Sequence, residues 1–305
     1  MTAPILVILD RELKGAQPAL AKGARLAAAN QAPLRIVVNA YSSAMVRAVG
    51  LDNERLAAAR RQIENAWQQR AAELLGSDEP PLTTLWEKDS AAGLRQMILA
   101  HQPSLVVVHT SDDSTLRRHL FTPRDWQLIR KAPCPVLCVH ETPWPTTPRV
   151  LAALDPATND SDDALSVAVL EAARNQARDL GADLAVCHVL DELDEGMVLL
   201  VGETLPDYGD SMEKIRAHYR DNFFRFGTSH GLNPEQMITL NGPVASTLAN
   251  YCNDNPVDLL VVGTVHRSLP ERLLLGATAE ALITRASTDV LVIKPEGFQS
   301  PWLAD

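Results

Sequence analysis

A strand-like run, two glycines and two arginines lie close together near the end of the chain. The apolar run DLLVVG ends at Gly263, and Arg267 and Arg272 follow it. Gly276 then opens a segment with apolar residues at helical spacing, namely Ala279, Leu282, Ile283 and Ala286. A loop of this kind leads from a strand end to a helix N-terminus, where free backbone N–H groups and the helix dipole attract an anion. These residues predict a phosphate site, although glycines also end strands and open helices without any ligand.

A second group of residues has side chains that could bind a metal. Cys134, Cys138 and His140 share one face of a strand at a period of two. Their spacing matches no usual zinc pattern, and a free cysteine in an apolar strand is commonly a small buried hydrophobe. We expect no metal site. No Ser/His/Asp or Cys/His arrangement can be assembled, so we predict no catalytic residues and no enzymatic activity.

Composition limits the possible partners. The chain has 305 residues, a formal net charge of −10 and a mean hydropathy of −0.07. A length near twice the usual domain size favours two domains. The negative charge argues against binding to nucleic acid or to an anionic membrane surface, because phosphate backbones require clustered Lys and Arg. No apolar run is long enough to span a bilayer and no signal peptide is evident, so we expect a cytoplasmic protein.

The chain contains an internal repeat. After a shift of 154 positions, residues 104–139 lie on residues 258–293 without a gap and share many identities. The openings also match, because ILVILD ends at Asp10 and VLAALD ends at Asp155. We predict a first domain over residues 1–142, a Pro-rich linker over 143–148, a second domain over 149–296 and a C-terminal tail over 297–305.

Each copy alternates strand and helix patterns. In the first copy, short apolar runs typical of strands buried on both faces cover residues 5–9, 34–38, 105–108 and 136–139. Apolar residues share one helical face in each copy: Leu56, Ala59, Ile63, Ala66, Trp67 and Leu74 in the first, and Ile215, Tyr219, Phe223 and Phe226 in the second, where Gly227 is expected to end the helix. We predict two tandem doubly wound, Rossmann-like α/β domains, each with a mainly parallel five-stranded sheet flanked by helices.

The glycine loop resembles that of the universal stress protein family. Nucleotide-binding members carry G-x2-G-x9-G-[ST], and the matching residues are Gly263, His266, Gly276 and Ala277. The spacing is intact and two of the four residues differ. The segments FTPRDWQLIRKAPCPV and VVGTVHRS are similar to the tandem E-type members of bacteria. The resemblance implies a role in stress tolerance, packing of the two domains as a pseudo-twofold pair, unidentified protein partners and the possibility of a homodimer.

The resemblance also implies a set of ligand contacts in the second domain. In ATP-binding relatives, an Asp after the first strand and a Val after the second contact the nucleoside, and the glycine loop holds the phosphates. The matching residues here are Asp155, Val189, Gly263, His266, Gly276 and Ala277, with Arg267 adding charge and Thr278 offering a substitute hydroxyl. Without the family context, Asp155 is equally a turn residue and Val189 a core residue. His266 either crowds the phosphates or donates to them. The implied cofactor is ATP, with Mg²⁺.

The first copy departs further from the motif. His109, Asp112, Thr122 and Pro123 stand where the second copy has Gly263, His266, Gly276 and Ala277. Thr122 and Pro123 suit a helix start, and Asp125 suits a capping box. We therefore expect no cofactor in the first domain.

Three functions remain open. The first is a non-catalytic stress-response protein that senses a nucleotide in its second domain, the second is a ligand-free scaffold for protein partners, and the third is a weak ATPase. The SGGxDS loop and the HIGH-type tetrapeptide of related adenylating enzymes do not occur. The segment 191–210, acidic at its ends and apolar at its centre, is expected to cover its own domain, a ligand cavity or a dimer partner.

Overall fold

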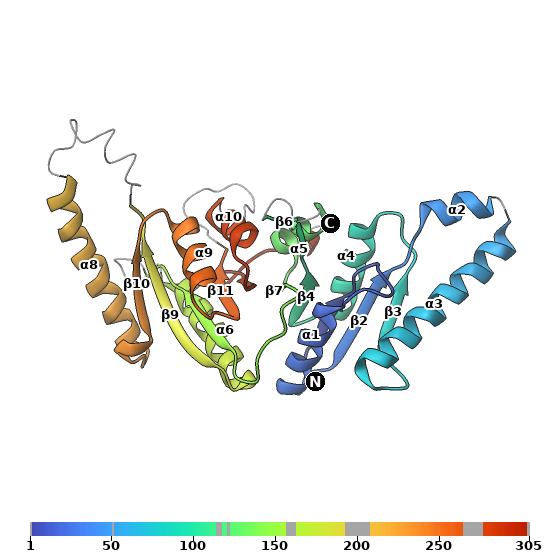
Figure 1. The fold of residues 1–305 in the computed structure, drawn as a ribbon, viewed down its shortest axis with the longest axis horizontal. Helices are drawn as coiled ribbons and strands as arrows, with labels where there is room; N and C mark the ends of the chain where they lie inside the picture. Colours follow the sequence, from blue (N-terminus) through green and yellow to red (C-terminus); the bar gives the residue numbers. More distant parts are fainter. Residues whose placement is uncertain are drawn as a thin grey trace. The chain divides into compact units, whose positions relative to one another are not determined.

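A computed structural model describes residues 2–50, 52–113, 118–120, 123–156, 163–192, 208–264 and 277–303 (Figure 1). The chain divides into two compact units. Unit 1 holds Met1–Asp112, Leu120–Pro143 and Gln299–Asp305, and unit 2 holds Asp113–His119 and Trp144–Phe298. The predicted domain boundaries and the predicted pseudo-twofold packing stay predictions.

The strands of unit 1 form a parallel sheet. They are β1 (Ile5–Ile8), β2 (Leu34–Asn39), β3 (Leu82–Leu85), β4 (Leu105–His109) and β7 (Val136–Val139), in the order β3-β2-β1-β4-β7. Every residue of β1, β4 and β7 is buried, as the continuous apolar runs predict for strands covered on both faces. The predicted doubly wound α/β fold is confirmed.

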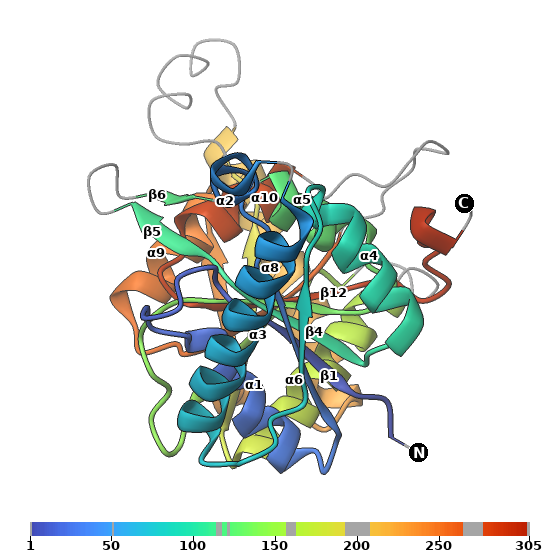
Figure 2. The same ribbon diagram turned by 90° about the vertical axis from the view of Figure 1, so that its right-hand side faces the viewer.

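Helices cover both faces of this sheet. They are α1 (Pro18–Ala29), α2 (Ser43–Val49), α3 (Asn53–Leu75), α4 (Ser90–His101) and α5 (Pro123–Lys131). Helix α1 contacts α3, and α4 contacts α5. Figure 2 shows α1 and α3 on one side of the strands and α4 on the other. Side-chain caps explain why several helices begin where they do: Ser42, Asp52 and Asp89 each accept a backbone N–H of the first turn.

Unit 2 repeats this plan. Its strands are β8 (Arg149–Ala153), β9 (Asp183–Leu190), β10 (Met237–Asn241), β11 (Leu259–Gly263) and β12 (Asp289–Ile293), paired in parallel in the order β10-β9-β8-β11-β12. Its helices are α6 (Ala164–Leu180), α8 (Tyr208–Ser229), α9 (Val244–Asp254) and α10 (Ala277–Arg285). A short 3-10 helix, η2 (Pro234–Gln236), leads into β10. A separate two-stranded sheet pairs β5 (Ser111–Asp113) with β6 (Arg118–Leu120). Across the described parts of the chain, no helix is both long and apolar enough to cross a membrane.

Two predicted helical faces are only partly buried. Of the predicted α3 face, Trp67 is buried, whereas Leu74 is 41% exposed. In α8, Phe223 and Phe226 are buried, but Ile215 is 40% exposed. Only part of the length of each helix lies beside the sheet of its unit (Figure 1). The periodicity therefore predicts the helix correctly but overstates how much of its apolar face reaches the core.

Two helical glycines allow close packing. A Cβ at Gly23 of α1 would overlap Val7 Cγ2 of β1, and a Cβ at Gly227 of α8 would overlap the end of the Met237 side chain. The prediction that Gly227 ends its helix is wrong, because α8 continues to Ser229 and the chain turns at Gly231 with a φ of 73°. Gly227 instead makes room for a neighbouring side chain.

The two glycines should respond differently to substitution. We expect Gly23→Ala to lower the free energy of unfolding by about 1–3 kcal/mol, because the branched Val7 side chain lies in a fully buried strand and cannot move aside. Gly227→Ala is the matched control. It should stay within about 0.5 kcal/mol of wild type, because the flexible Met237 end can shift and alanine favours a helix. Urea titrations measure both, and equal losses in the two variants would contradict the explanation.

The C-terminal segment packs as part of unit 1. Ser300 Oγ donates to the carbonyl of Lys131 at 2.5 Å, and Arg95 donates to the carbonyl of Trp302 at 3.3 Å. The 3-10 helix η3 (Pro301–Leu303) contacts α4, and Trp302 is buried with 6% exposure. The predicted tail thus contributes an aromatic side chain to the core of unit 1.

Removing that aromatic side chain should destabilise the protein. We expect Trp302→Ala to cost about 3 kcal/mol, the usual scale for deleting a buried aromatic ring. Leu303→Ala is the control, because Leu303 is 67% exposed and such a change usually costs less than about 0.5 kcal/mol. Thermal and urea unfolding report the difference. Two indistinguishable variants would show that the tail adds nothing to the core.

Candidate functional site

Both sheets have a topological switch point. In unit 1 the chain passes from β1 through α1 to β2 on one side, and from β4 through α5 to β7 on the other. Strands β1 and β4 are direct neighbours, with Ile8 beside Val108. The equivalent neighbours in unit 2 are β8 and β11, with Ala152 beside Val261. Ligands of open α/β sheets bind outside the carboxyl ends of such strand pairs, so these two places are the candidate sites.

In unit 2, Asp155 lies just beyond the end of β8. Its backbone N–H is 3.3 Å from Ser166 Oγ of α6, which holds the turn. The side chain of Asp155 is 60% exposed. Asp155 is therefore a turn residue, which is one of the two roles that the sequence left open for it. Its carboxylate also faces solvent at the switch point.

His188, near the end of β9, lies beside this turn. Its Nδ1 is 3.0 Å from the carbonyl oxygen of Leu154 and 3.9 Å from Asp155 Oδ1. Because a carbonyl oxygen only accepts, Nδ1 carries the proton. The ring is buried, stacked on Tyr219 at 6.0 Å and tilted against Phe223 at 5.7 Å. His188 thus fixes the carbonyl that precedes Asp155.

Sequence reasoning gave His188 no role at this site. The available signal is a histidine within the apolar run AVCHVL, one position before Val189. Its relation to Leu154 follows from the register of β8 and β9, in which Ala153 lies beside Cys187. That register cannot be read from the spacing of either strand alone.

The remaining predicted residues fall partly within the structure. Val189 is half-buried at the end of β9, and Gly263 ends β11. A Cβ at Gly263 would come within 2.7 Å of Leu165 Cγ, so the absence of a side chain allows α6 to approach the strand end. His266, Arg267 and Gly276 lie outside the described residues. Ala277 and Thr278 form the first turn of α10, and their side chains also lie outside what is described.

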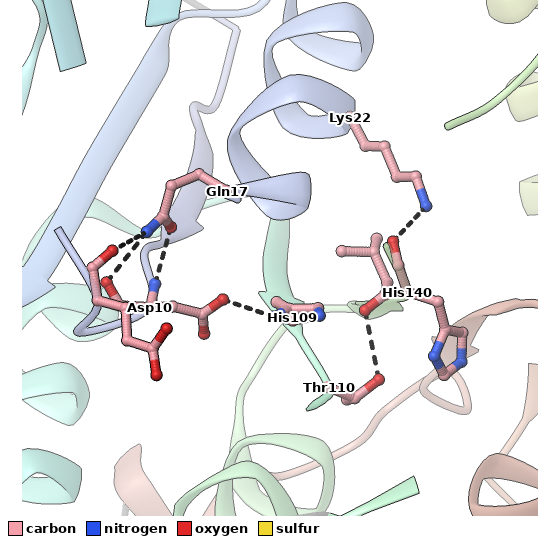
Figure 3. Close-up of polar contacts among 8 residues, drawn as sticks. Asp10, Gln17, Lys22, His109, Thr110 and His140 are labelled. Atoms are coloured by element: carbon pink, nitrogen blue, oxygen red, sulfur yellow. Dashed lines mark hydrogen bonds and ion pairs between the residues drawn. The ribbon is translucent and has the colours of Figure 1, made fainter. Parts of the chain in front are cut away.

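The switch point of unit 1 is bridged by two side chains (Figure 3). His109 Nδ1 at the end of β4 lies 2.5 Å from Asp10 Oδ2 beyond the end of β1. The His109 side chain is 8% exposed and that of Asp10 is 28% exposed. His109 stands where unit 2 has Gly263, and Asp10 stands where it has Asp155. The two units therefore carry different residues at the switch point, where ligands of this fold class bind.

Further polar contacts surround this pair. Gln17 accepts the N–H of Asp10 at 3.0 Å and donates to the carbonyls of Asp10 and Glu12. The buried Lys22 of α1 donates to the carbonyl of His140 at 2.8 Å, just beyond β7 (Figure 3). Buried polar groups of this kind are stable only when they are hydrogen-bonded. The carboxyl ends of β1, β4 and β7 are thus linked to residues of α1 and its preceding loop.

Asn39 provides another internal link in unit 1. By strand register it stands where unit 2 has Val189, because Ile8 lies beside Val37 and Ala153 beside Cys187. Asn39 is buried, donates to the carbonyl of Glu87 at 2.8 Å and accepts the Glu87 N–H at 3.1 Å. An amide side chain therefore joins the ends of β2 and β3 at this position.

The cysteines are packed as apolar residues. Cys134, Cys138, Cys187 and Cys252 are free and buried. Within the described ranges, no three His, Cys, Asp or Glu side chains are grouped as a metal site would require. Burial raises the pKa of the Cys187 thiol, with a smaller contribution from Cys252, and burial raises the pKa of Cys252 to about 12. Such thiols remain protonated and unreactive at neutral pH.

This burial predicts the behaviour of the thiols. We expect no rapid reaction of the native protein with Ellman's reagent at pH 8, and release of four thiols per chain after unfolding in guanidinium. Because the thiol pKa values are raised in the folded state, the unfolded state loses its thiol protons at a lower pH than the folded state does. The free energy of unfolding should therefore fall as pH rises above about 9. Prompt labelling of any cysteine in the native protein would contradict this packing.

Comparison with known proteins identifies the kind of domain that is repeated. A model described as the universal stress protein family matches residues 1–140 and residues 147–294. The chain is 23% identical over 305 residues to Universal stress protein E of Photorhabdus laumondii, covering 97% of this chain and 96% of the relative. It is 26% identical to the Universal stress protein E homolog of Haemophilus influenzae, covering 69% and 68%.

Solved structures share the fold. A functionally unknown protein from Pseudomonas aeruginosa superposes with a TM-score of 0.71 at 24% identity, covering 97% of this chain and 93% of that one. A universal stress protein from Archaeoglobus fulgidus superposes with a TM-score of 0.55 at 13% identity, covering 96% and 99%. At these identities the likeness concerns the fold alone.

Proposed function

Because this chain belongs to the universal stress protein family and carries its domain twice, we propose that it is a non-catalytic stress-response protein that binds ATP or another adenine nucleotide in its second unit. The proposed location is the cytoplasm, with Mg²⁺ accompanying the phosphates and unidentified proteins as partners. One observation carries the proposal: at the switch point of unit 2, an exposed carboxylate on Asp155 adjoins a strand that ends in Gly263.

The described residues fit a nucleoside on this side of the crevice. A carboxylate can accept both hydroxyl hydrogens of a ribose, and the side chain of Asp155 is 60% exposed at the switch point. His188 holds the preceding carbonyl, and Ser166 accepts the Asp155 N–H, so the turn is fixed before a ligand arrives. A prearranged turn lowers the entropy lost on binding.

The proposed phosphate site is inferred from the order of residues along the chain. Helix α10 begins at Ala277, directly after the last glycine of the motif. A helix N-terminus attracts an anion through its free N–H groups and its dipole. Arg267 adds a positive charge within the same loop. His266 and Ala277 alter two contacts of the family pattern but leave the helix start in place.

A ligand-free scaffold is the second candidate. The observation that favours it is the Asp10–His109 pair, because unit 1 keeps the same architecture while its switch point is filled by its own side chains. If His266 closes the second crevice in a comparable way, the whole chain would act through protein partners. A weak ATPase has less support, because the SGGxDS loop and the HIGH-type tetrapeptide of related adenylating enzymes do not occur in the sequence.

Calorimetric titration of ATP and Mg²⁺ tests the proposal. We expect wild type to bind one nucleotide per chain, and Asp155→Ala and Gly276→Val each to weaken binding at least tenfold, or by about 1.4 kcal/mol. Asp10→Ala is the matched control, because it removes the equivalent carboxylate from unit 1 and should leave ATP affinity unchanged. Mass spectrometry of small molecules released from the purified protein gives an independent view of the ligand.

Two results would replace the proposal with an alternative. If wild type binds no nucleotide and His266→Gly gains binding, then the site is a relic and the scaffold function stands. If wild type hydrolyses ATP steadily and Gly276→Val abolishes hydrolysis, then the protein is an enzyme.

A further inference from the structure

We infer that unit 1 is self-liganded. His109 contacts Asp10 and fills the place that an external ligand would take in unit 2. The inference rests on the proposed function in one respect, namely that the crevice of unit 2 is a nucleoside site. Its consequence is that unit 1 has a latent site, closed by one side chain, for an uncharged nucleoside.

The position of the pair is the first reason. Asp10 and His109 follow β1 and β4, which are adjacent parallel strands at the switch point. The 2.5 Å contact between His109 Nδ1 and Asp10 Oδ2 therefore crosses the crevice in which a ligand of this fold class would lie. The equivalent positions in unit 2 are Asp155 and Gly263, and a glycine has no side chain with which to cross.

Exposure is the second reason. The side chain of Asp10 is 28% exposed, compared with 60% for Asp155. The two carboxylates occupy the same place in the repeat and differ in what lies across from them. His109 already bonds Oδ2 of Asp10, so it takes one of the two carboxylate oxygens that a ribose would use. His109 thus competes with any ligand for Asp10.

The turn that carries Asp10 is held in position for this contact. Gln17 is buried, accepts the Asp10 N–H at 3.0 Å, and donates to the carbonyls of Asp10 at 3.3 Å and Glu12 at 3.2 Å. Figure 3 shows Gln17 on one side of Asp10 and His109 on the other. Gln17 therefore holds the backbone at Asp10, and His109 contacts its carboxylate.

The phosphate side of unit 1 has also been replaced by protein groups. Helix α5 begins at Pro123, which has no N–H to offer, and Asp125 in its first turn is 2% exposed. A buried carboxylate within the first turn already satisfies the positive end of the helix. Asp112 and Asp113 add two negative charges shortly after β4. An anion is thus disfavoured at this end, so a ligand admitted by the loss of His109 would be a nucleoside without phosphates.

The test opens unit 1 while unit 2 is silenced. Asp155→Ala serves as the background, and adenosine and ATP are the titrants in calorimetry. We expect this background protein to bind both titrants at least tenfold more weakly than wild type. Adding His109→Gly, the residue that unit 2 carries at this position, should create adenosine binding that a further Asp10→Ala weakens at least tenfold. ATP should bind the opened variant at least tenfold more weakly than adenosine.

Two outcomes of the titration overturn the inference. One is an Asp155→Ala/His109→Gly protein that is folded by circular dichroism and binds no adenosine. The other is adenosine binding by the Asp155→Ala background that Asp10→Ala abolishes, because the crevice would then be open with His109 present. Failure of the proposed function is seen separately, as a lack of ATP binding by wild type, and it removes the comparison with unit 2, whereas the two outcomes above concern unit 1 alone.

A measurement on intact His109 covers the case in which the glycine variant does not fold. The Nδ1 proton of His109 should exchange with solvent at least tenfold more slowly than the ring protons of the exposed His218, as followed by ¹⁵N-edited NMR. Asp10→Ala, which removes the acceptor, should abolish that protection. Exchange as fast as that of His218 in wild type would overturn the inference.

Discussion

Parallel pairing of strands that are buried on both faces is the constraint from which both sites follow. Because β1 and β4, like β8 and β11, are buried and run in parallel, the chain must return by helices on the sheet faces. Connections that leave neighbouring strands toward opposite sides then open a crevice at their carboxyl ends. The location of both candidate sites is thus a property of the topology, and only their contents depend on individual side chains.

The two units show how far those contents can diverge on one frame. After the first strand of each unit the chain has an aspartate, Asp10 in unit 1 and Asp155 in unit 2. At the end of the adjacent strand, β4 in unit 1 and β11 in unit 2, the residues differ, because unit 1 has His109 and unit 2 has Gly263. At His109 the side chain reaches across to Asp10. At Gly263, Leu165 of α6 approaches so closely that no Cβ would fit. Each residue is therefore locked in by its own neighbours, which makes a simple exchange between the units costly.

The sequence predicted the fold and the location of the candidate sites better than the side-chain contacts within them. Apolar runs such as Leu105–His109 identify buried strands because burial on both faces removes the alternation of polar residues. The repeat places Asp155 because it follows from counting along the chain. His188 and the Asp10–His109 contact depend on the register between strands, and Gly227 on a side chain ten residues further along the chain. Contacts of this kind arise from packing, which periodicity and spacing do not encode.

If unit 2 binds a nucleotide as proposed while unit 1 is closed by its own side chains, the chain separates two tasks. A ligand that binds only the folded state stabilises that state more as the ligand concentration rises. In unit 1 the hydrogen bonds of Asp10, Gln17 and His109 are internal, so these contacts form without a ligand. In unit 2 the side chain of Asp155 is 60% exposed, and under the proposed function the stability of this unit would rise with ligand. A tandem chain arranged in this way can report a metabolite through unit 2 while unit 1 remains a constant framework.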